Sequence, residues 1–529
     1  MTKSVNLSLL KTFLPEFKKL LPNCPQKLSD QSFVDAYFRV FSFIANTYST
    51  NHFFLASPYS CLKRYDRSDK SDYDRFRYTA ELPLILGYTY GVYCIISNVS
   101  FLFFRIIRLL LFYDFARIPP KRKPAPFPYH SVNTSCLVVS HLNSPSDLDA
   151  DDDFYFPGLA ASLKSLNVRP AFLYTNKPSL DRSAEVLLST RRDLLTAVIP
   201  SQLPVLIQVR IYLQLLINDA LVLLHFLPTL FFHDAPPYSK RFLLVFLGSS
   251  RHSVSNLLLL YSLQSHIAFH RYDHIVFPFE GNSWESMLCV AARQSSQARL
   301  HAFCHTEVRP DFSFLNPVLS TQYSPDHFLV SHECFTVNLV SSYSCLNSAS
   351  FSTVGFTSIY RSLSHRSPHS NPRATVENSS LIFCPDGFMS SSLAFIDLAV
   401  LYSKHSSCRC TVCLHPSVYD QISESLPDHP SIFILKGPLC SSLLSSHQAL
   451  VFQTSTVALV AAYLAIPAIF FDPQCNTVSP LSYLLGSCHV ARNVLELALV
   501  VNNLPISSSP PSGLMSYDPL VFAASIIRS

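Results

Sequence analysis

The chain has 529 residues, which is enough for two or three domains with buried cores. Hydrophobic residues make up 48% of the chain and charged residues only 14%, a balance that excludes an intrinsically disordered protein. The formal net charge is +5 and the chain has no dense Lys/Arg tract, which excludes an extended nucleic-acid-binding surface.

The N-terminal stretch and the cysteines both indicate a reducing compartment. The stretch MTKSVNLSLLKTFLPEFKKLLP has lysines among its apolar positions, so it does not form the uninterrupted apolar run of a secretory signal. The 15 cysteines are odd in number and irregularly spaced, which predicts reduced thiols. A strand over residues 409–414 would place Cys410 and Cys413 on opposite faces, so no metal site is predicted there. We expect a cytoplasmic protein.

Two long apolar segments raise the question of a membrane. Residues 82–104 carry no charge over a length that could cross a bilayer, and arginines and lysines follow from Arg105 onward. Three interpretations remain open, namely a membrane span, an association with the inner face of the cytoplasmic membrane, and a buried core helix. Polar residues inside the segment favour the core helix. Residues 205–232 contain Arg210 and Asp219, which favours a helix lodged in the domain or at a membrane interface over a span.

Short apolar strands then alternate with helices, which predicts parallel βαβ units. A helical N-terminal region with a basic, Pro-rich linker is expected over residues 1–130, and two α/β domains over residues 131–370 and 378–510. The expected strands lie at residues 136–140, 171–175, 274–278, 299–303, 327–331, 380–384, 409–414, 431–435, 449–453 and 468–471. The predicted fold class is therefore α/β, with two Rossmann-like doubly wound domains. Ligands of such sheets bind beyond the carboxyl ends of the strands.

Polar residues follow several strands of the last domain. Thr454, Ser455 and Thr456 stand at the start of a helix, where exposed N–H groups and hydroxyls attract phosphate, although a simple helix cap is the favoured explanation when they are taken alone. His415 ends an earlier strand and is a second candidate phosphate contact, with a turn histidine as the alternative. Asp386 and Gly387 follow the first strand of this domain in a Pro-Asp-Gly sequence that also favours a plain β-turn.

In the first α/β domain, the most distinctive stretch is FPFEGNSWE. Glu280 directly follows a strand, and a carboxylate there can act as a general base toward a sugar hydroxyl. Trp284, His305 and Thr306 are candidate acceptor-binding residues near it. The alternative is that Glu280 only favours the dipole of the helix that follows. The acidic loop at residues 147–153 is interpreted as a solvated loop rather than as a cation site.

The order of these motifs resembles a family of bacterial surface-carbohydrate synthesis proteins, including capsule-polysaccharide transferases. The similarity covers about residues 136–475 and rests on the blocks PFEGNSWE, AARQ, CHT, CPDGF, LHPS and TSTVALVAAYLAIP. It implies a GT-B glycosyltransferase with no bound cofactor or metal. Its substrates would be a nucleotide-sugar donor, held by the C-terminal domain, and a glycan or lipid-linked acceptor, held by the middle domain. By the same resemblance Glu280 is the base, and His415, Ser455 and Thr456 contact the donor phosphate.

The chain departs from the family at several positions. A glutamate of the family is Val460 here, and the glycine before Ile-Pro is Ala465. These departures keep two alternatives open. One is a polyol-phosphate transferase that uses a cytidine nucleotide. The other is a catalytically degenerate scaffold or assembly protein.

Overall fold

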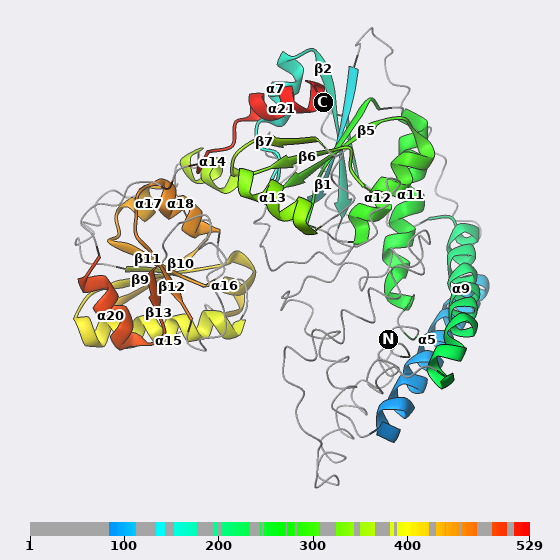
Figure 1. The fold of residues 1–529 in the computed structure, drawn as a ribbon, viewed down its shortest axis with the longest axis horizontal. Helices are drawn as coiled ribbons and strands as arrows, with labels where there is room; N and C mark the ends of the chain where they lie inside the picture. The colour runs from blue at the N-terminus through cyan, green and yellow to red at the C-terminus, as the bar shows by residue number, and fades with distance from the viewer. Residues whose placement is uncertain are drawn as a thin grey trace.

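The fold was obtained as a computed structural model (Figure 1). It describes two α/β domains and a pair of long helices. Apart from a few single positions, the described residues are 84–112, 134–142, 153–176, 195–198, 203–232, 250–270, 272–280, 283–305, 324–342, 350–364, 381–385, 389–422, 430–437, 441–453, 456–472, 489–504 and 513–528.

The first domain is built on a seven-stranded sheet with the order β3-β2-β1-β4-β5-β6-β7. All neighbouring strands are parallel. The chain adds strands on one side of β1 and then returns to add the others from β4 onward, which is the doubly wound pattern of a Rossmann-like domain. The strands are β1 (Thr134–Leu142), β2 (Val168–Asn176), β3 (Leu195–Val198), β4 (His274–Pro278), β5 (Arg299–Cys304), β6 (His327–Val330) and β7 (Ser350–Thr353).

Both faces of this sheet are buried, because apolar side chains leave each strand in both directions. In β1, Leu137 and Val139 belong to the core that includes α11 (Val254–His270) and α12 (Ser283–Ser295). Cys136 and Val138 belong to a second core that includes α7 (Leu159–Ser165). Continuous apolar strands are expected where helices cover both faces of a parallel sheet. Two further helices, α13 (Glu333–Ser342) and α14 (Thr357–Ser364), follow β6 and β7.

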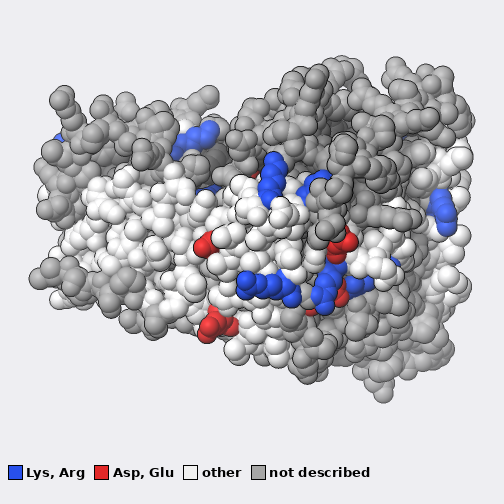
Figure 2. Space-filling model, turned by 90° about the horizontal axis from the view of Figure 1, so that it is seen from above, with Lys and Arg blue, Asp and Glu red and all other residues white. Residues whose placement is uncertain are grey.

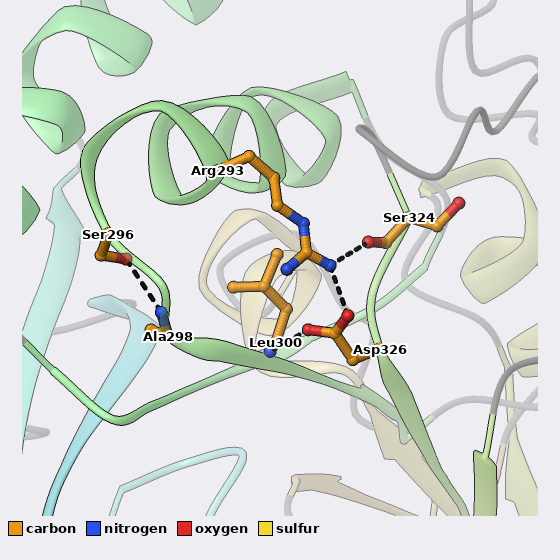
Figure 3. A network of polar contacts seen from close by, with 6 residues as sticks. All are labelled: Arg293, Ser296, Ala298, Leu300, Ser324 and Asp326. Carbon is orange, nitrogen blue, oxygen red and sulfur yellow. Dashed lines mark hydrogen bonds and ion pairs between the residues drawn. The ribbon is translucent and has the colours of Figure 1, made fainter.

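A polar network fixes α12 against the sheet (Figure 3). An Arg293 guanidinium nitrogen lies 2.6 Å from Asp326 Oδ1 and also donates to the Ser324 carbonyl. The other Asp326 oxygen accepts a hydrogen bond from the Leu300 backbone N–H. The AARQ block of the sequence resemblance thus contains an arginine that ties α12 to β5 and to the start of β6.

The second domain repeats the pattern with a six-stranded parallel sheet in the order β10-β9-β8-β11-β12-β13. The prediction of two Rossmann-like domains is confirmed by these two strand orders. The strands are β8 (Leu381–Cys384), β9 (Cys410–Leu414), β10 (Ile432–Lys436), β11 (Ala449–Phe452), β12 (Ala468–Phe471) and β13 (His489–Ala491). In β9, Cys410 and Cys413 fall into different cores, as the predicted alternation requires.

Helices cover both faces of the second sheet (Figure 1). One layer contains α15 (Met389–Ser406), α16 (Pro416–Ile422) and α20 (Val494–Asn502). The other contains α17 (Ser441–Ser445) and α18 (Val457–Tyr463). Helix α18 also packs against α14 of the first domain, and the buried core continues from one domain into the other there.

The last helix, α21 (Pro519–Arg528), returns to the first domain, where it packs against α7 (Figure 1). Phe522, Ala523 and Ile526 are buried in the second core of that domain. A close backbone approach precedes the helix, since the Phe356 N–H donates to the Met515 carbonyl. Gly355 has a φ of +81°, and a Cβ there would lie 2.4 Å from the Ser516 carbonyl oxygen, so only glycine fits.

Two long apolar helices, α5 (Leu84–Phe112) and α9 (Val205–Phe232), lie side by side (Figure 1). The preferred interpretation of residues 82–104 as a buried core helix is wrong. Only 17% of the apolar window of α5 is buried, and the corresponding value for α9 is 28%. Among the described residues, both helices are long and apolar enough to cross a membrane.

Candidate functional site

The strand order of the first sheet reverses between β1 and β4, so ligand-binding residues are expected at the carboxyl ends of these strands. Three candidate side chains are located at this edge. His141 lies near the end of β1, Glu280 follows β4, and His305 follows β5. The Phe279 N–H donates to the Phe303 carbonyl, which joins the ends of β4 and β5. The fold therefore brings residues from three separate segments to one edge.

Glu280 and His305, both predicted site residues, are in direct contact. The His305 Nε2 atom lies 3.1 Å from the Glu280 Oε1 atom. The Glu280 side chain is 30% exposed and the His305 side chain only 11% exposed. A substrate can therefore reach the carboxylate of Glu280 more easily than the imidazole of His305. The histidine contacts the carboxylate from the protein interior.

A second glutamate shapes the loop that carries Glu280. Glu285 is 1% exposed in the first turn of α12, and its Oε1 atom accepts a hydrogen bond from the Glu280 backbone N–H at 2.9 Å. A carboxylate in the first turn also favours the helix dipole. The structural role that the sequence offered as the alternative for Glu280 is thus filled by Glu285.

Aromatic side chains pack next to the Glu280–His305 pair. The Tyr155 ring lies edge-on to His305 with centroids 4.7 Å apart, and His141 meets Trp284 at 4.6 Å. His141 and Tyr155 are 5.9 Å apart between centroids, which closes the series. Trp284 is partly buried and also packs against the hydrophobic core of the domain. Aromatic rings present flat apolar faces with polar edges, a surface that suits a sugar ring.

The position of Tyr155 is set by the acidic loop. Asp153 is buried, and its Oδ1 atom accepts hydrogen bonds from Ser140 Oγ and from the backbone N–H groups of Tyr155 and Phe156. Burial raises the pKa of the Asp153 carboxyl above its usual range, although these hydrogen bonds oppose the shift. The interpretation of a solvated loop is thus wrong for Asp153. Within the described residues, no group of three His, Cys, Asp or Glu side chains could hold a metal ion.

The second sheet has its own reversal between β8 and β11. The Ser391 hydroxyl at the start of α15 donates to the Gln453 side-chain oxygen beyond β11 at 2.9 Å, which joins the two segments. His415 is exposed at the end of β9. Thr456 precedes α18 as its N-cap residue, but its hydroxyl makes no capping hydrogen bond. The other predicted site residues, Thr306, Asp386, Gly387, Thr454 and Ser455, lie outside the described residues.

Two positions at which the chain departs from the family it resembles, Val460 and Ala465, lie within the described residues. Val460 belongs to α18, is 1% exposed and packs in the core, so the side chain at this position points into the protein interior. Ala465 has a φ of +59°, the left-handed conformation that glycine adopts without strain. The Ile466 N–H bonds the Ala461 carbonyl and the Ala465 N–H bonds the Ala462 carbonyl, which is the Schellman end of a helix.

No family model matches the chain, and no curated protein matches it. Solved structures show distant similarity. The UDP-GlcNAc 2-epimerase from Methanocaldococcus jannaschii is 13% identical with a TM-score of 0.46, over 75% of this chain and 99% of that one. The putative UDP-N-acetylglucosamine 2-epimerase from Listeria monocytogenes is 11% identical with a TM-score of 0.47, over 74% and 94%. The calicheamicin glycosyltransferase CalG4 is 12% identical with a TM-score of 0.39, over 70% and 89%.

Sequence reasoning missed two residues of the first site, His141 and Tyr155. The predicted strand at residues 136–140 ends just before His141, whereas β1 continues to Leu142. A histidine at the carboxyl end of the strand beside the reversal was the available signal. Tyr155 gave no comparable signal, because its place depends on the buried carboxylate of Asp153.

Proposed function

We propose that the chain is a glycosyltransferase that moves a sugar from a nucleotide-activated donor to a hydroxyl group of a surface polysaccharide or lipid-linked glycan. The observation that carries this proposal is the contact between Glu280 and His305 at the carboxyl edge of the first sheet. Support also comes from the two Rossmann-like sheets, since each offers a ligand-binding edge at its own reversal point. The two edges suit two substrates, an acceptor and a donor.

Glu280 acts as the general base in this proposal. Its carboxylate takes the proton of the acceptor hydroxyl as that oxygen bonds to the anomeric carbon of the donor sugar. The bond from the anomeric carbon to the donor phosphate oxygen breaks, and the nucleotide leaves with the electron pair. His305 keeps the carboxylate oriented toward the acceptor, and orientation of this kind lowers the barrier without new bonds. The aromatic cluster of His141, Tyr155, Trp284 and His305 lines the acceptor side.

The donor is assigned to the second domain. His415 and Thr456 lie after β9 and β11, and the hydroxyl of Thr456 is not used to cap α18. Together with Asp386, Gly387, Thr454 and Ser455, they form the predicted donor-binding set. Hydroxyl and imidazole donors suit the phosphate oxygens of a nucleotide.

The test combines ligand binding with turnover. Purified protein is screened by thermal shift against UDP-, GDP- and CMP-linked donors, and turnover is followed with the donor that stabilises the fold. Glu280→Gln should lower turnover by about 10²- to 10⁴-fold while the donor-induced shift is kept. The matched control is Glu333→Gln, at an exposed glutamate in the first turn of α13.

Two outcomes would overturn the proposal. Unchanged turnover in Glu280→Gln removes the assigned base. The absence of a thermal shift with every nucleotide supports the scaffold alternative. Transfer of a polyol phosphate from a cytidine nucleotide would keep the site but change the reaction, and mass analysis of the product distinguishes it.

A further inference from the structure

The outer faces of α5 and α9 expose a large apolar surface. On α9 the exposed large side chains are three, four or seven positions apart, so they lie along one side of the helix. On α5 the spacing is similar, with some adjacent residues also exposed, so this set covers a wider strip on one side of its helix. Monomeric soluble proteins rarely expose a continuous apolar patch of more than a few hundred Å². The exposed residues are Val92, Tyr93, Ile96, Val99, Phe103, Phe104, Ile107, Leu110 and Leu111 on α5, and Leu206, Leu213, Ile217, Leu221 and Leu224 on α9.

The polar residues at the middle of the pair face the opposite way. Asn98 of α5 is fully buried, and its amide nitrogen donates to Asp219 Oδ2 of α9 at 2.9 Å. Ser250, which begins the short helix η4 (Ser250–Ser253), bonds both residues. A surface helix of a soluble domain turns its apolar side inward and its polar side outward. This pair is apolar on both sides, since Leu102 of α5 and Leu215 of α9 are buried in the core while the outer faces are apolar too. Its polar residues Asn98 and Asp219 bond each other on the inner side, the placement that polar residues adopt in helices that meet lipid.

The two helices run antiparallel. Asn98 lies opposite Asp219, and Arg105, further along α5, lies near Tyr212, which comes earlier in α9. The arginines Arg105, Arg108 and Arg210 therefore share one end of the pair. Figure 2 shows another face of the molecule, on which described basic and acidic side chains lie near one another with wide uncharged areas around them.

Beyond the arginines, each helix is apolar over a similar length. Residues 84–104 carry no charged side chain, and residues 211–232 carry only Asp219, which is bonded to Asn98. At 1.5 Å per residue these segments measure about 31 and 33 Å, close to the roughly 30 Å hydrocarbon thickness of a bilayer.

We propose that α5 and α9 insert side by side into a lipid bilayer, with their outer faces in the hydrocarbon and the three arginines at anionic headgroups. The matched apolar lengths and the position of the arginines at one end favour a bilayer over a second copy of the chain. A protein interface would not require either feature. The inserted pair would hold the first domain, with Glu280, at the membrane surface.

The first test is flotation of the full chain with vesicles of phosphatidylcholine, alone or mixed with phosphatidylglycerol. Wild-type protein should float with both, and more strongly with the anionic mixture. The double variant Ile96→Lys/Leu221→Lys should reduce the bound fraction at least about tenfold, because lysine at this depth is expensive. Val337→Lys, at an exposed apolar residue of α13, is the matched control and should float as wild type. Circular dichroism confirms that each variant is folded.

The second test measures depth. Trp284 is the only tryptophan, so Trp284→Phe removes the native tryptophan fluorescence and lets a single introduced tryptophan serve as the probe. In that background, Phe104→Trp should shift to shorter wavelength and be quenched by brominated lipid, whereas Val337→Trp should not. Flotation that the lysine pair leaves unchanged would overturn the proposal. A second result would also overturn it. Wild-type protein would fail to bind vesicles, and sedimentation would show a dimer that the same pair of lysine substitutions converts to a monomer. Neither readout involves turnover, so its failure leaves the assignment of Glu280 untouched.

Discussion

His305 Nε2 lies 3.1 Å from Glu280 Oε1, and the two residues follow neighbouring strands of one parallel sheet. The pair thus depends on strand register, since a shift of one residue in β5 would turn His305 to the other face. The contact also gives the two residues different roles. In the proposed function, the more exposed carboxylate meets the substrate and the more buried imidazole acts through it.

His305→Asn should therefore lower kcat by about 10- to 100-fold with little change in the donor KM, because the variant affects orientation and not donor binding. Steady-state kinetics measure both constants. The double variant with Glu280→Gln should be no slower than Glu280→Gln alone, since the histidine acts only through the carboxylate. Additive losses would show that His305 contributes independently.

Ala465→Gly should stabilise the second domain by about 0.5–1 kcal/mol. The alanine Cβ is strained at a φ of +59°, and glycine removes that strain at the cost of a more flexible unfolded chain. Urea unfolding measures the change. Ala462→Gly, the same substitution within α18, should instead destabilise by about 1 kcal/mol. If both variants lose stability equally, strain at Ala465 is not the cause.

Three histidines form a row across the amino-terminal half of the first sheet. His301 Nε2 lies 3.0 Å from His274 Nδ1, and His301 Nδ1 lies 3.2 Å from His327 Nδ1. Burial lowers the pKa of His327 to about 4 and that of His301 to about 2. Both histidines are therefore neutral in the folded protein over a pH range in which the unfolded chain binds protons.

The free energy of unfolding should consequently fall as the pH drops below about 6.5, with a slope of about 1.4 kcal/mol per pH unit for each buried histidine. For His327 the loss continues to about pH 4. Urea unfolding from pH 7 to pH 4.5, followed by Trp284 fluorescence, tests this. His327→Gln should reduce the slope, whereas His405→Gln, at an exposed position of α15, should not. An unchanged slope in His327→Gln would contradict the prediction.

The strands that the sequence predicted are those with dense apolar runs. HIVFP matches β4 residue for residue, because four of its five side chains are buried and apolar. The strands LTAV and SFST, which form β3 and β7, were missed because they are short and, in SFST, mostly polar. Edge strands need less apolar surface, since only one neighbour pairs with them.

The candidate site could be predicted where a short stretch carried its own signal, as at Glu280 and His305 after their strands and at Trp284 in the FPFEGNSWE stretch. Its ring cluster joins His141, Tyr155 and Trp284 from β1, the following loop and α12, and such contacts are created by tertiary packing. The inward direction of Asn98 and Asp219 was likewise hidden, since a sequence shows polar residues in an apolar segment but not the partner that they face.

The docking of α21 has a consequence for biosynthesis. The second core of the first domain closes only when Phe522, Ala523 and Ile526 reach it, although the last strand of that domain ends at Thr353. A ribosome therefore makes the entire second sheet before the first domain can bury this face. Domains commonly fold as they emerge from the ribosome. The second domain should therefore complete its core before the first domain does. Until α21 is made, the first domain should keep an exposed apolar face that chaperones can recognise.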